Sequence, residues 1–165
     1  MQSIIIENEL VTIGQEIEYV RSYLTIQKMR YKDKLEFEIN VDPRITHAQI
    51  IRLVLQPIVE NAIYHGLKYK ESKGMLKVHG YELGERIIID ITDDGVGMDE
   101  ETLKHIYDKH KVNYHSNGVG VYNVQQRLVL YYGKEYGIIY HSEKGKGTTA
   151  TVVIPKRQED VHEKI

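Results

Sequence analysis

An acid beside two glycines marks the first place where this sequence could bind a small molecule. Asp93 directly follows a run that is typical of a strand, and Gly95 and Gly97 come after it. Glycines at the end of a strand let a ligand approach the backbone closely. A carboxylate there can accept a hydrogen bond from an amino group such as that of adenine. The alternative, open for each glycine-rich stretch of this chain taken alone, is a simple turn.

Two further glycine pairs allow the same two interpretations. Gly118 directly precedes a predicted helix that begins at Val119, and Gly120 lies in the first turn of that helix. The free N–H groups of this first turn would suit a phosphate group. The third pair lies between two predicted strands, directly before Thr148. The sequence has no G-x-x-x-x-G-K-[ST] motif, and neither G-x-G has the third glycine of a dinucleotide-binding fingerprint. These patterns exclude a P-loop and a Rossmann-type site.

Three polar residues share one predicted helix: Glu60, Asn61 and His65. Asn61 and His65 are four residues apart and would lie on the same helix face. An asparagine amide oxygen is a hard ligand that suits Mg²⁺, which usually takes its other ligands from water and from phosphates. The alternative is that Asn61 caps or satisfies a buried backbone group.

The elements that must position these residues follow from periodicity and capping signals. Thr12 and Gln15 have the form of a capping box, and Ile17, Val20 and Leu24 follow at helical spacing as candidate core residues. Strict alternation of apolar and polar residues predicts a half-buried strand at 35–41. The remaining patterns predict strands at 75–82 and 86–93 in a hairpin, a short helix from residue 99, a polar loop at 108–117, a helix over 119–132, and strands at 137–143 and 148–154.

A second capping box, Thr46 with Gln49, predicts a helix that runs to about His65 and ends at Gly66. Pro57 would then lie in the helix interior, where it removes a backbone hydrogen bond and introduces a kink at a cost of roughly 3 kcal/mol. Strands that are adjacent in hairpins, with the helices segregated from them, indicate an α+β two-layer sandwich rather than a doubly wound parallel sheet.

Composition excludes several classes of protein. The 165 residues suffice for one domain, and 41% apolar with 28% charged residues is ordinary for a globular chain. The net charge of −2 gives no basic excess, so we expect no nucleic-acid partner and no direct membrane contact. Because cysteine is absent, disulfide scaffolds, thiolate zinc sites and cysteine nucleophiles are excluded. The five-residue spacing of His105, His110 and His115 does not place them on one helix face, which favours a solvated loop over a metal site. We expect Arg127 to form a structural ion pair, with a contact to phosphate as the alternative.

Taken together, the motifs resemble a known family. An asparagine-bearing helix followed by D-x-G-x-G, G-x-G-x-x-N and G-x-G-T is similar to the signature of the GHKL ATP-binding (Bergerat) fold. More narrowly, the segment 55–66 resembles the N box of LytS/YesM-type sensor histidine kinases, including the proline after glutamine. The segment 18–30 is similar to the piece that joins their dimerisation region to their ATPase domain. The resemblance covers roughly 11–155 and implies a mixed, mostly antiparallel sheet packed against helices.

The resemblance implies a role for each candidate residue. Asn61 would hold Mg²⁺, with His65 nearby, and Asp93 would bind the adenine amino group of ATP. The backbone near the base and the phosphates would be shaped by Gly95, Gly97, Gly118, Val119, Gly120 and Val121. Thr148 would lie near the adenine through water, and 98–117 would be the ATP lid, with Lys104, Lys109 and Lys111 as candidate phosphate contacts. Glu60 would assist the phosphoacceptor histidine as a polar or acid–base group.

The chain also departs from the family pattern. Tyr64 stands where many relatives have a lysine, and Asp94 replaces a common asparagine, so we expect Asp94 to face away from the phosphates. The family's phosphoacceptor motif is absent from these residues. We therefore expect a linker helix at 1–33, a catalytic domain at 34–155 and a charged tail at 156–165, in a fragment that begins after the substrate histidine.

The resemblance implies a function with two alternatives. The chain would be the ATP-binding catalytic domain of a sensor histidine kinase, transferring the γ-phosphoryl group to a histidine on the upstream helix of its kinase dimer, for relay to a response regulator. It would lie in the cytoplasm as part of a membrane-anchored parent. A hydrolytic GHKL ATPase is disfavoured because its water-activating glutamate would stand at Pro57, which carries no base. A degenerate, non-catalytic nucleotide or protein interaction domain is the other alternative.

Overall fold

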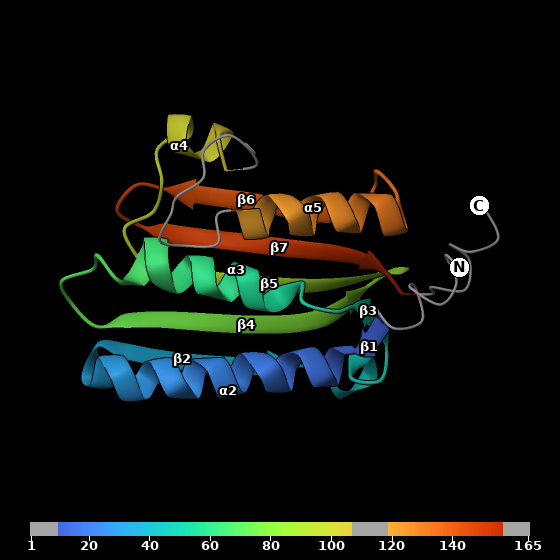
Figure 1. Ribbon diagram of the computed structural model, residues 1–165, viewed down its shortest axis with the longest axis horizontal. Coiled ribbons are helices and arrows are strands. Elements are labelled where there is room, and N and C mark those ends of the chain that lie inside the picture. Colours follow the sequence, from blue (N-terminus) through green and yellow to red (C-terminus); the bar gives the residue numbers. More distant parts are fainter. Residues whose placement is uncertain (1–9, 107–118, 157–165) are drawn as a thin grey trace.

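The computed structural model describes residues 10–106 and 119–156, and they form a sheet covered by helices on one face (Figure 1). In this part of the chain the main sheet has five strands in the order β2-β4-β5-β7-β6. β2 and β4 pair in parallel, and every other neighbouring pair is antiparallel. The strands are β2 (Leu35–Val41), β4 (Gly74–Leu83), β5 (Arg86–Asp93), β6 (Gly137–Glu143) and β7 (Gly147–Pro155). The predicted α+β sandwich is confirmed.

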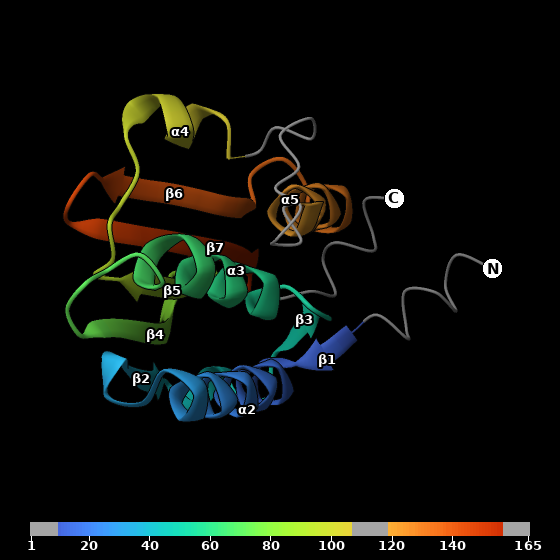
Figure 2. The same ribbon diagram turned by 60° about the vertical axis from the view of Figure 1, so that its left-hand side comes forward.

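Three helices form the second layer, and Figure 2 shows them side by side over the same face of the sheet. They are α2 (Ile13–Tyr31), α3 (Leu55–Asn61) and α5 (Val119–Tyr132), while the short α4 (Glu100–Lys104) lies beyond β6. In α2 the predicted capping box between Thr12 and Gln15 is present, and Ile17, Val20 and Leu24 are buried as predicted. No helix among the described residues is long and apolar enough to span a lipid bilayer.

The helix predicted from Thr46 is wrong over its first half. Thr46 lies in a turn, and β3 (Gln49–Ile51) pairs antiparallel with β1 (Leu10–Thr12), a strand that the pattern did not reveal. The carbonyls of Thr46 and Ala48 accept hydrogen bonds from the backbone N–H groups of Gly14 and Ile13, at 2.9 and 2.8 Å. Tertiary pairing with the start of α2 therefore overrides the local capping signal.

Because the helix begins only at Leu55, Pro57 occupies its first turn. The missing N–H of a proline has no helical partner to lose at that place, so the predicted interior kink is wrong. The irregularity lies instead at Ala62–Leu67, which continues α3 as a π-helical segment, η3. Such segments are often found at functional sites. Gly66 lies within η3 rather than ending the helix.

Candidate functional site

A cavity of about 360 Å³ opens between α3 with η3, α4, the first turns of α5 and the ends of β5 and β7. Pockets for small ligands commonly have volumes of about 300–1,000 Å³. Of the residues predicted for the site, six line it: Asn61, His65, Asp93, Gly97, Val121 and Thr148. Segments far apart in the sequence therefore converge here, and the apolar remainder of the wall includes Ile58, Ile91 and Ala150.

Asp93 forms the base of this cavity. Its residue is only 4% exposed, and its Oδ1 accepts a hydrogen bond from the backbone N–H of Gly95 at 2.9 Å. Burial raises the pKa of the Asp93 carboxyl to about 6, and the nearby charge of Asp94 acts in the same direction. The N–H groups of Gly95 and Thr148 and the charge of Lys70 only partly oppose this shift.

The glycines around Asp93 are explained by close approaches of the backbone. A Cβ at Gly66 would lie 2.5 Å from Asp93 Oδ1, and one at Gly95 would overlap the backbone of Gly66. Gly97 adopts a positive φ of 68°, and a Cβ there would overlap the carbonyl of Glu143. The D-x-G-x-G loop is thus clamped between η3 and the β6–β7 turn, which fixes the Asp93 side chain against the cavity.

Asn61 and His65 form the wall that faces α4 and α5. Asn61 is the last residue of α3, and its amide can present either an oxygen or a nitrogen to the cavity. His65 lies one turn later in η3, and burial lowers the pKa of its imidazole. The ring of Tyr64 meets that imidazole edge-on at 5.0 Å, and the ammonium of Lys68 lies 4.4 Å from the centre of the Tyr64 ring.

Thr148 faces Asp93 across the β5–β7 pair. Its hydroxyl is oriented by Ser142, a residue to which no motif in the sequence points. Ser142 Oγ accepts from the backbone N–H of Met98 at 2.8 Å and lies 3.0 Å from the carbonyl oxygen of Gly147 and 2.7 Å from Thr148 Oγ1. Ser142 has one hydroxyl proton, so when it donates to Gly147 the Thr148 hydroxyl donates to Ser142. Thr148 then keeps acceptor capacity on the cavity side.

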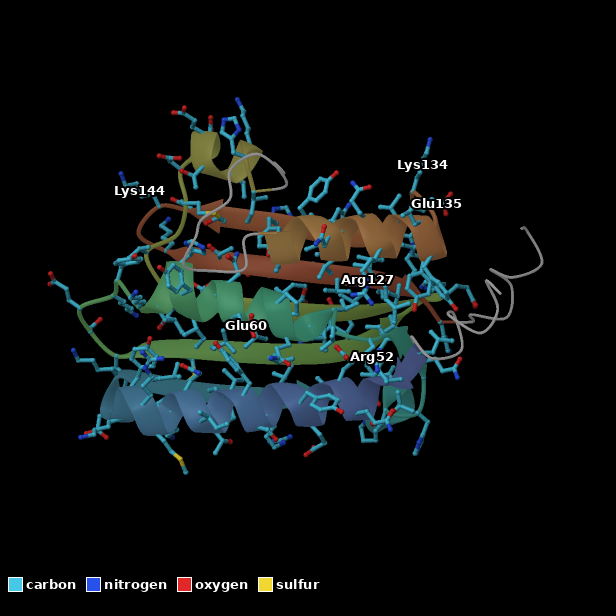
Figure 3. All side chains as sticks on the ribbon, in the orientation of Figure 1. Arg52, Glu60, Arg127, Lys134, Glu135 and Lys144 are labelled. Carbon is cyan, nitrogen blue, oxygen red and sulfur yellow. The ribbon has the colours of Figure 1, made fainter. Side chains whose placement is uncertain are left out.

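Other predicted site residues lie elsewhere. Glu60 is outside the cavity lining, and its Oε1 accepts from the side-chain amide of Gln56 at 3.0 Å; Figure 3 labels it on α3. Gly120, in the first turn of α5, faces Pro57, whose Cβ would lie 3.3 Å from a Cβ at Gly120. Val119 begins α5, and Gly118 lies outside the described residues, as do Lys109 and Lys111.

Two predictions about single residues can be compared with the structure. His105 lies at the end of α4, within the segment predicted as the lid, and lines the cavity, whereas His110 and His115 fall outside the described residues. Within residues 10–106 and 119–156 Arg127 has no ion-pair partner, contrary to the prediction; its guanidinium donates to the backbone carbonyls of Arg52, at 2.6 Å, and Leu53, at 3.4 Å. Figure 3 shows Arg52 and Arg127 near one another.

Asp94 points away from the cavity, as expected from its charge. Its carboxylate accepts from the backbone N–H of Met75 at 2.8 Å and lies 3.0 Å from the ammonium of Lys70. Glu101 and Thr102 of α4 and Tyr140 of β6 also line the cavity, although no motif in the sequence points to them. Glu101 and Thr102 fall within the predicted lid, and Tyr140 falls within the strand predicted at 137–143.

The side chains in this cavity fit a nucleotide with a magnesium ion. The buried carboxylate of Asp93 can accept a hydrogen bond from an amino group, and the apolar lining residues Ile91 and Ala150 can pack against a flat nucleobase. Among the described residues, no group of three or more His, Cys, Asp or Glu side chains could hold a metal ion. Mg²⁺ does not need such a cage, because it commonly takes one or two protein oxygens and completes its shell from phosphates and water. The amide oxygen of Asn61, which lines the cavity, would fit that role.

Comparisons with known proteins agree with this geometry. A family model described as "Histidine kinase-, DNA gyrase B-, and HSP90-like ATPase" matches residues 46–158, and a histidine kinase model matches 1–35. The chain is 33% identical to the sensor histidine kinase YesM of Bacillus subtilis and 30% identical to the sensor protein LytS of Bacillus cereus, over 96% and 90% of its own length. It spans only about a quarter of the length of these relatives (26% and 25%).

Solved structures show the same fold. The catalytic domain of histidine kinase ThkA superposes with a TM-score of 0.68 at 15% identity, covering 91% of this chain and 96% of that one. The mycobacterial sensor histidine kinase MprB gives a TM-score of 0.64 at 21% identity, covering 90% and 99%. Since the first family model matches well over half of the residues, this chain belongs to the family of histidine kinase-, DNA gyrase B- and HSP90-like ATPases.

Proposed function

We propose that this chain is the ATP-binding catalytic domain of a sensor histidine kinase. It binds Mg–ATP in the cavity and delivers the γ-phosphoryl group to a histidine on an upstream helix of its kinase dimer, for relay to a response regulator. The observation that carries the proposal is the buried Asp93 carboxylate at the base of a cavity whose wall also holds Asn61. The proposal includes a cytoplasmic location within a membrane-anchored parent, and no nucleic-acid partner.

In this proposal Asp93 accepts a hydrogen bond from the adenine amino group. Thr148 offers a second acceptor nearby, which reaches the base through water, and the Gly95–Gly97 loop lets the base lie against the backbone. The amide oxygen of Asn61 holds Mg²⁺, which neutralises charge on the phosphates when it is bound. The backbone at Gly118, Gly120 and Val121 approaches the phosphates where α5 begins.

Phosphoryl transfer requires little covalent chemistry from the protein. The residues act by holding the nucleotide in place and by offsetting its charge, so the rate depends on how the histidine is oriented toward the γ-phosphate. Glu60 is the proposed polar or acid–base helper. Because its carboxylate lies outside the cavity lining, it would meet a histidine only at the rim, on the side where Gln56 lies.

The hydrolytic alternative requires a proton acceptor one helical turn before Asn61. That position is Pro57, in the first turn of α3, and its ring has no proton acceptor. A bound water therefore has no activating side chain at that position, which supports phosphoryl transfer to an added acceptor over rapid hydrolysis.

The test is a binding titration followed by a transfer assay on the 165-residue chain. We expect it to bind ATP more tightly with Mg²⁺ than without, and to hydrolyse it slowly when alone. Adding the phosphoacceptor helix of a LytS/YesM-type kinase, as a fusion or a separate piece, should yield acid-labile phosphohistidine on that helix. Rapid hydrolysis that Asn61→Ala abolishes would favour the hydrolytic ATPase, and absence of ATP binding would favour the degenerate domain.

A further inference from the structure

A buried carboxylate outside the cavity connects α2 to α3. Glu16 lies on the buried face of α2 and is only 2% exposed. Its Oε1 accepts from the backbone N–H of Leu53 at 2.8 Å, and its Oε2 accepts from those of Val54 and Leu55 at 3.2 Å each. Both carboxylate oxygens are thus directed at one short turn that is 37 to 39 residues away in sequence.

Two of these N–H groups, those of Val54 and Leu55, belong to the start of α3, and that of Leu53 lies one residue before the N-cap. The first N–H groups of a helix have no partner within it and are usually satisfied by the helix's own N-cap side chain. Val54, the N-cap residue of α3, makes no such hydrogen bond. Glu16 therefore serves as the cap of α3 from a different helix, and its negative charge lies at the positive end of the helix dipole.

The same turn is fixed from its other side by α5. Arg127 donates to the carbonyls of Arg52 and Leu53, and the Tyr132 hydroxyl accepts from the backbone N–H of Ile51 at 3.2 Å. Leu53 has a positive φ of 60°, which is costly for a residue with a side chain. Such a conformation persists where the surroundings determine it fully. The turn 51–55 is thus a joint at which α2 and α5 both bind the start of α3.

We propose that Glu16 is a positioning residue for the nucleotide site. α3 has seven residues, with its capped end at Leu55 and Asn61 at its other end, roughly 9 Å away. A helix this short moves as one piece, so the carboxylate that fixes its start also fixes the cavity wall that carries Asn61. This inference rests on the proposed function, because it assumes that the ligand held by Asn61 is Mg–ATP.

The geometry has a consequence for α2, because coupling between two equilibria is reciprocal. If α2 must be docked through Glu16 for Asn61 to be in place, Mg–ATP binding must strengthen the docking of α2 by the same factor. Asp93 and Thr148 belong to the sheet rather than to α3, so adenosine, which lacks phosphates and their metal, should depend little on Glu16.

The test compares Glu16→Gln with Glu18→Gln in the 165-residue chain. Glutamine keeps the size of Glu16 but turns one acceptor oxygen into an N–H₂ group that faces backbone donors. Glu18 is the matched control on the same helix, where its exposed side chain lies 3.5 Å from Arg21. We expect Glu16→Gln to weaken Mg–ATP binding at least about fivefold, within the usual range of coupling between sites, with less than a twofold change for adenosine. Glu18→Gln should change neither affinity.

Hydrogen exchange of the unmodified chain keeps the proposal testable if Glu16→Gln fails to fold. Saturating Mg–ATP should slow exchange at the amides of 53–55 and of the first half of α2, and adenosine should slow it less. The proposal is overturned if folded Glu16→Gln binds Mg–ATP with unchanged affinity, or if Mg–ATP protects the cavity wall and leaves 53–55 unchanged. Failure of the unmodified chain to bind Mg–ATP at all would instead overturn the proposed function.

Discussion

In the described part of the chain two charged side chains are buried, and both are carboxylates: Glu16 and Asp93. They differ in what their oxygens meet. Glu16 accepts three backbone N–H groups from the turn that begins α3, so the fold itself uses its acceptor capacity. Asp93 accepts hydrogen bonds from the backbone N–H groups of Gly95 and Thr148 and otherwise faces the cavity, and burial raises the pKa of its carboxyl to about 6.

The contrast shows that burial alone does not mark a binding residue. A buried carboxylate whose oxygens are all paired stabilises the structure, and its removal leaves backbone donors without partners. A buried carboxylate with few hydrogen-bond donors around it has a raised pKa and an acceptor site without a donor. When a ligand donates a hydrogen bond to that site, the pKa of the carboxylate falls. Substitution of Glu16 should therefore act first on the stability of the fold, and on Mg–ATP affinity through the position of α3, whereas substitution of Asp93 should act directly on nucleotide affinity.

The largest expected effect is on stability at Glu16. Glu16→Ala leaves the N–H groups of Val54 and Leu55 buried without partners, and each such group costs about 1–3 kcal/mol. We expect the free energy of unfolding to fall by about 3 kcal/mol or more, measured by urea denaturation. Glu18→Ala, which removes an exposed carboxylate from the same helix, should change it by about 0.5 kcal/mol or less. Equal losses in the two variants would break the comparison.

The second effect is on affinity at Asp93. Asp93→Ala removes a hydrogen bond to a charged acceptor worth about 1.5–3 kcal/mol, so the Kd for ATP should rise by about one to two decades. Asp90→Asn is the control on the same strand: its carboxylate faces Tyr81 and Thr151 and does not line the cavity. Calorimetric titration should show normal affinity for the control, and unchanged affinity in folded Asp93→Ala would refute the adenine contact.

A smaller effect, on the metal-dependent part of the affinity, is expected at Asn61. Asn61→Ala removes the one neutral amide oxygen that α3 offers to the cavity, so the gain in ATP affinity on adding Mg²⁺ should shrink, and phosphotransfer to a supplied histidine helix should be lost. Adenosine binding should change little, because Asp93 and Thr148 remain. An equal loss of adenosine affinity would mean that Asn61 supports the fold of the cavity instead.

The smallest effect is the pH dependence that Asp93 imposes. Its carboxyl is ionised above a pKa of about 6 and protonated below it, so ATP affinity should fall by up to about tenfold for each unit of pH below 6. The raised pKa also means that the folded state holds this proton more tightly, so the stability that Asp93 contributes is lost as the pH rises through 6. Asp93→Asn should flatten both profiles, and a full slope in that variant would assign the titration to another group.

Much of this fold follows from local patterns. The start of α2 and the bounds of β2 match the prediction because a capping box and a strict alternation specify them without reference to the rest of the chain. Asp93 could be singled out because a strand end, an acid and two glycines are adjacent in sequence. A helix start, a strand or a candidate site residue can be predicted from the sequence when the residues that specify it are adjacent in the chain.

The predictions that failed concern residues whose structure depends on contacts with segments far away in the sequence. Thr46 and Gln49 have the form of a capping box, but pairing with β1 turns Gln49–Ile51 into a strand and moves Pro57 into the first turn of α3. Nothing local distinguishes Glu16 from Glu18, since only the fold brings the turn 53–55 to one of them. Arg127 was assigned an ion pair for the same reason, because its carbonyl partners are 74 and 75 residues away.

The adenine contact of Asp93 is tested most directly by the pKa of its carboxyl, measured by carbon-detected NMR in the free chain and with saturating ATP. The carboxyl should titrate with a pKa of about 6 in the free chain. This pKa should fall well below that on binding, because an adenine amino group that donates to the carboxylate favours its ionised form. A carboxyl that titrates at its ordinary value in the free chain, or a raised pKa that ATP leaves unchanged, would show that Asp93 does not bind the adenine amino group.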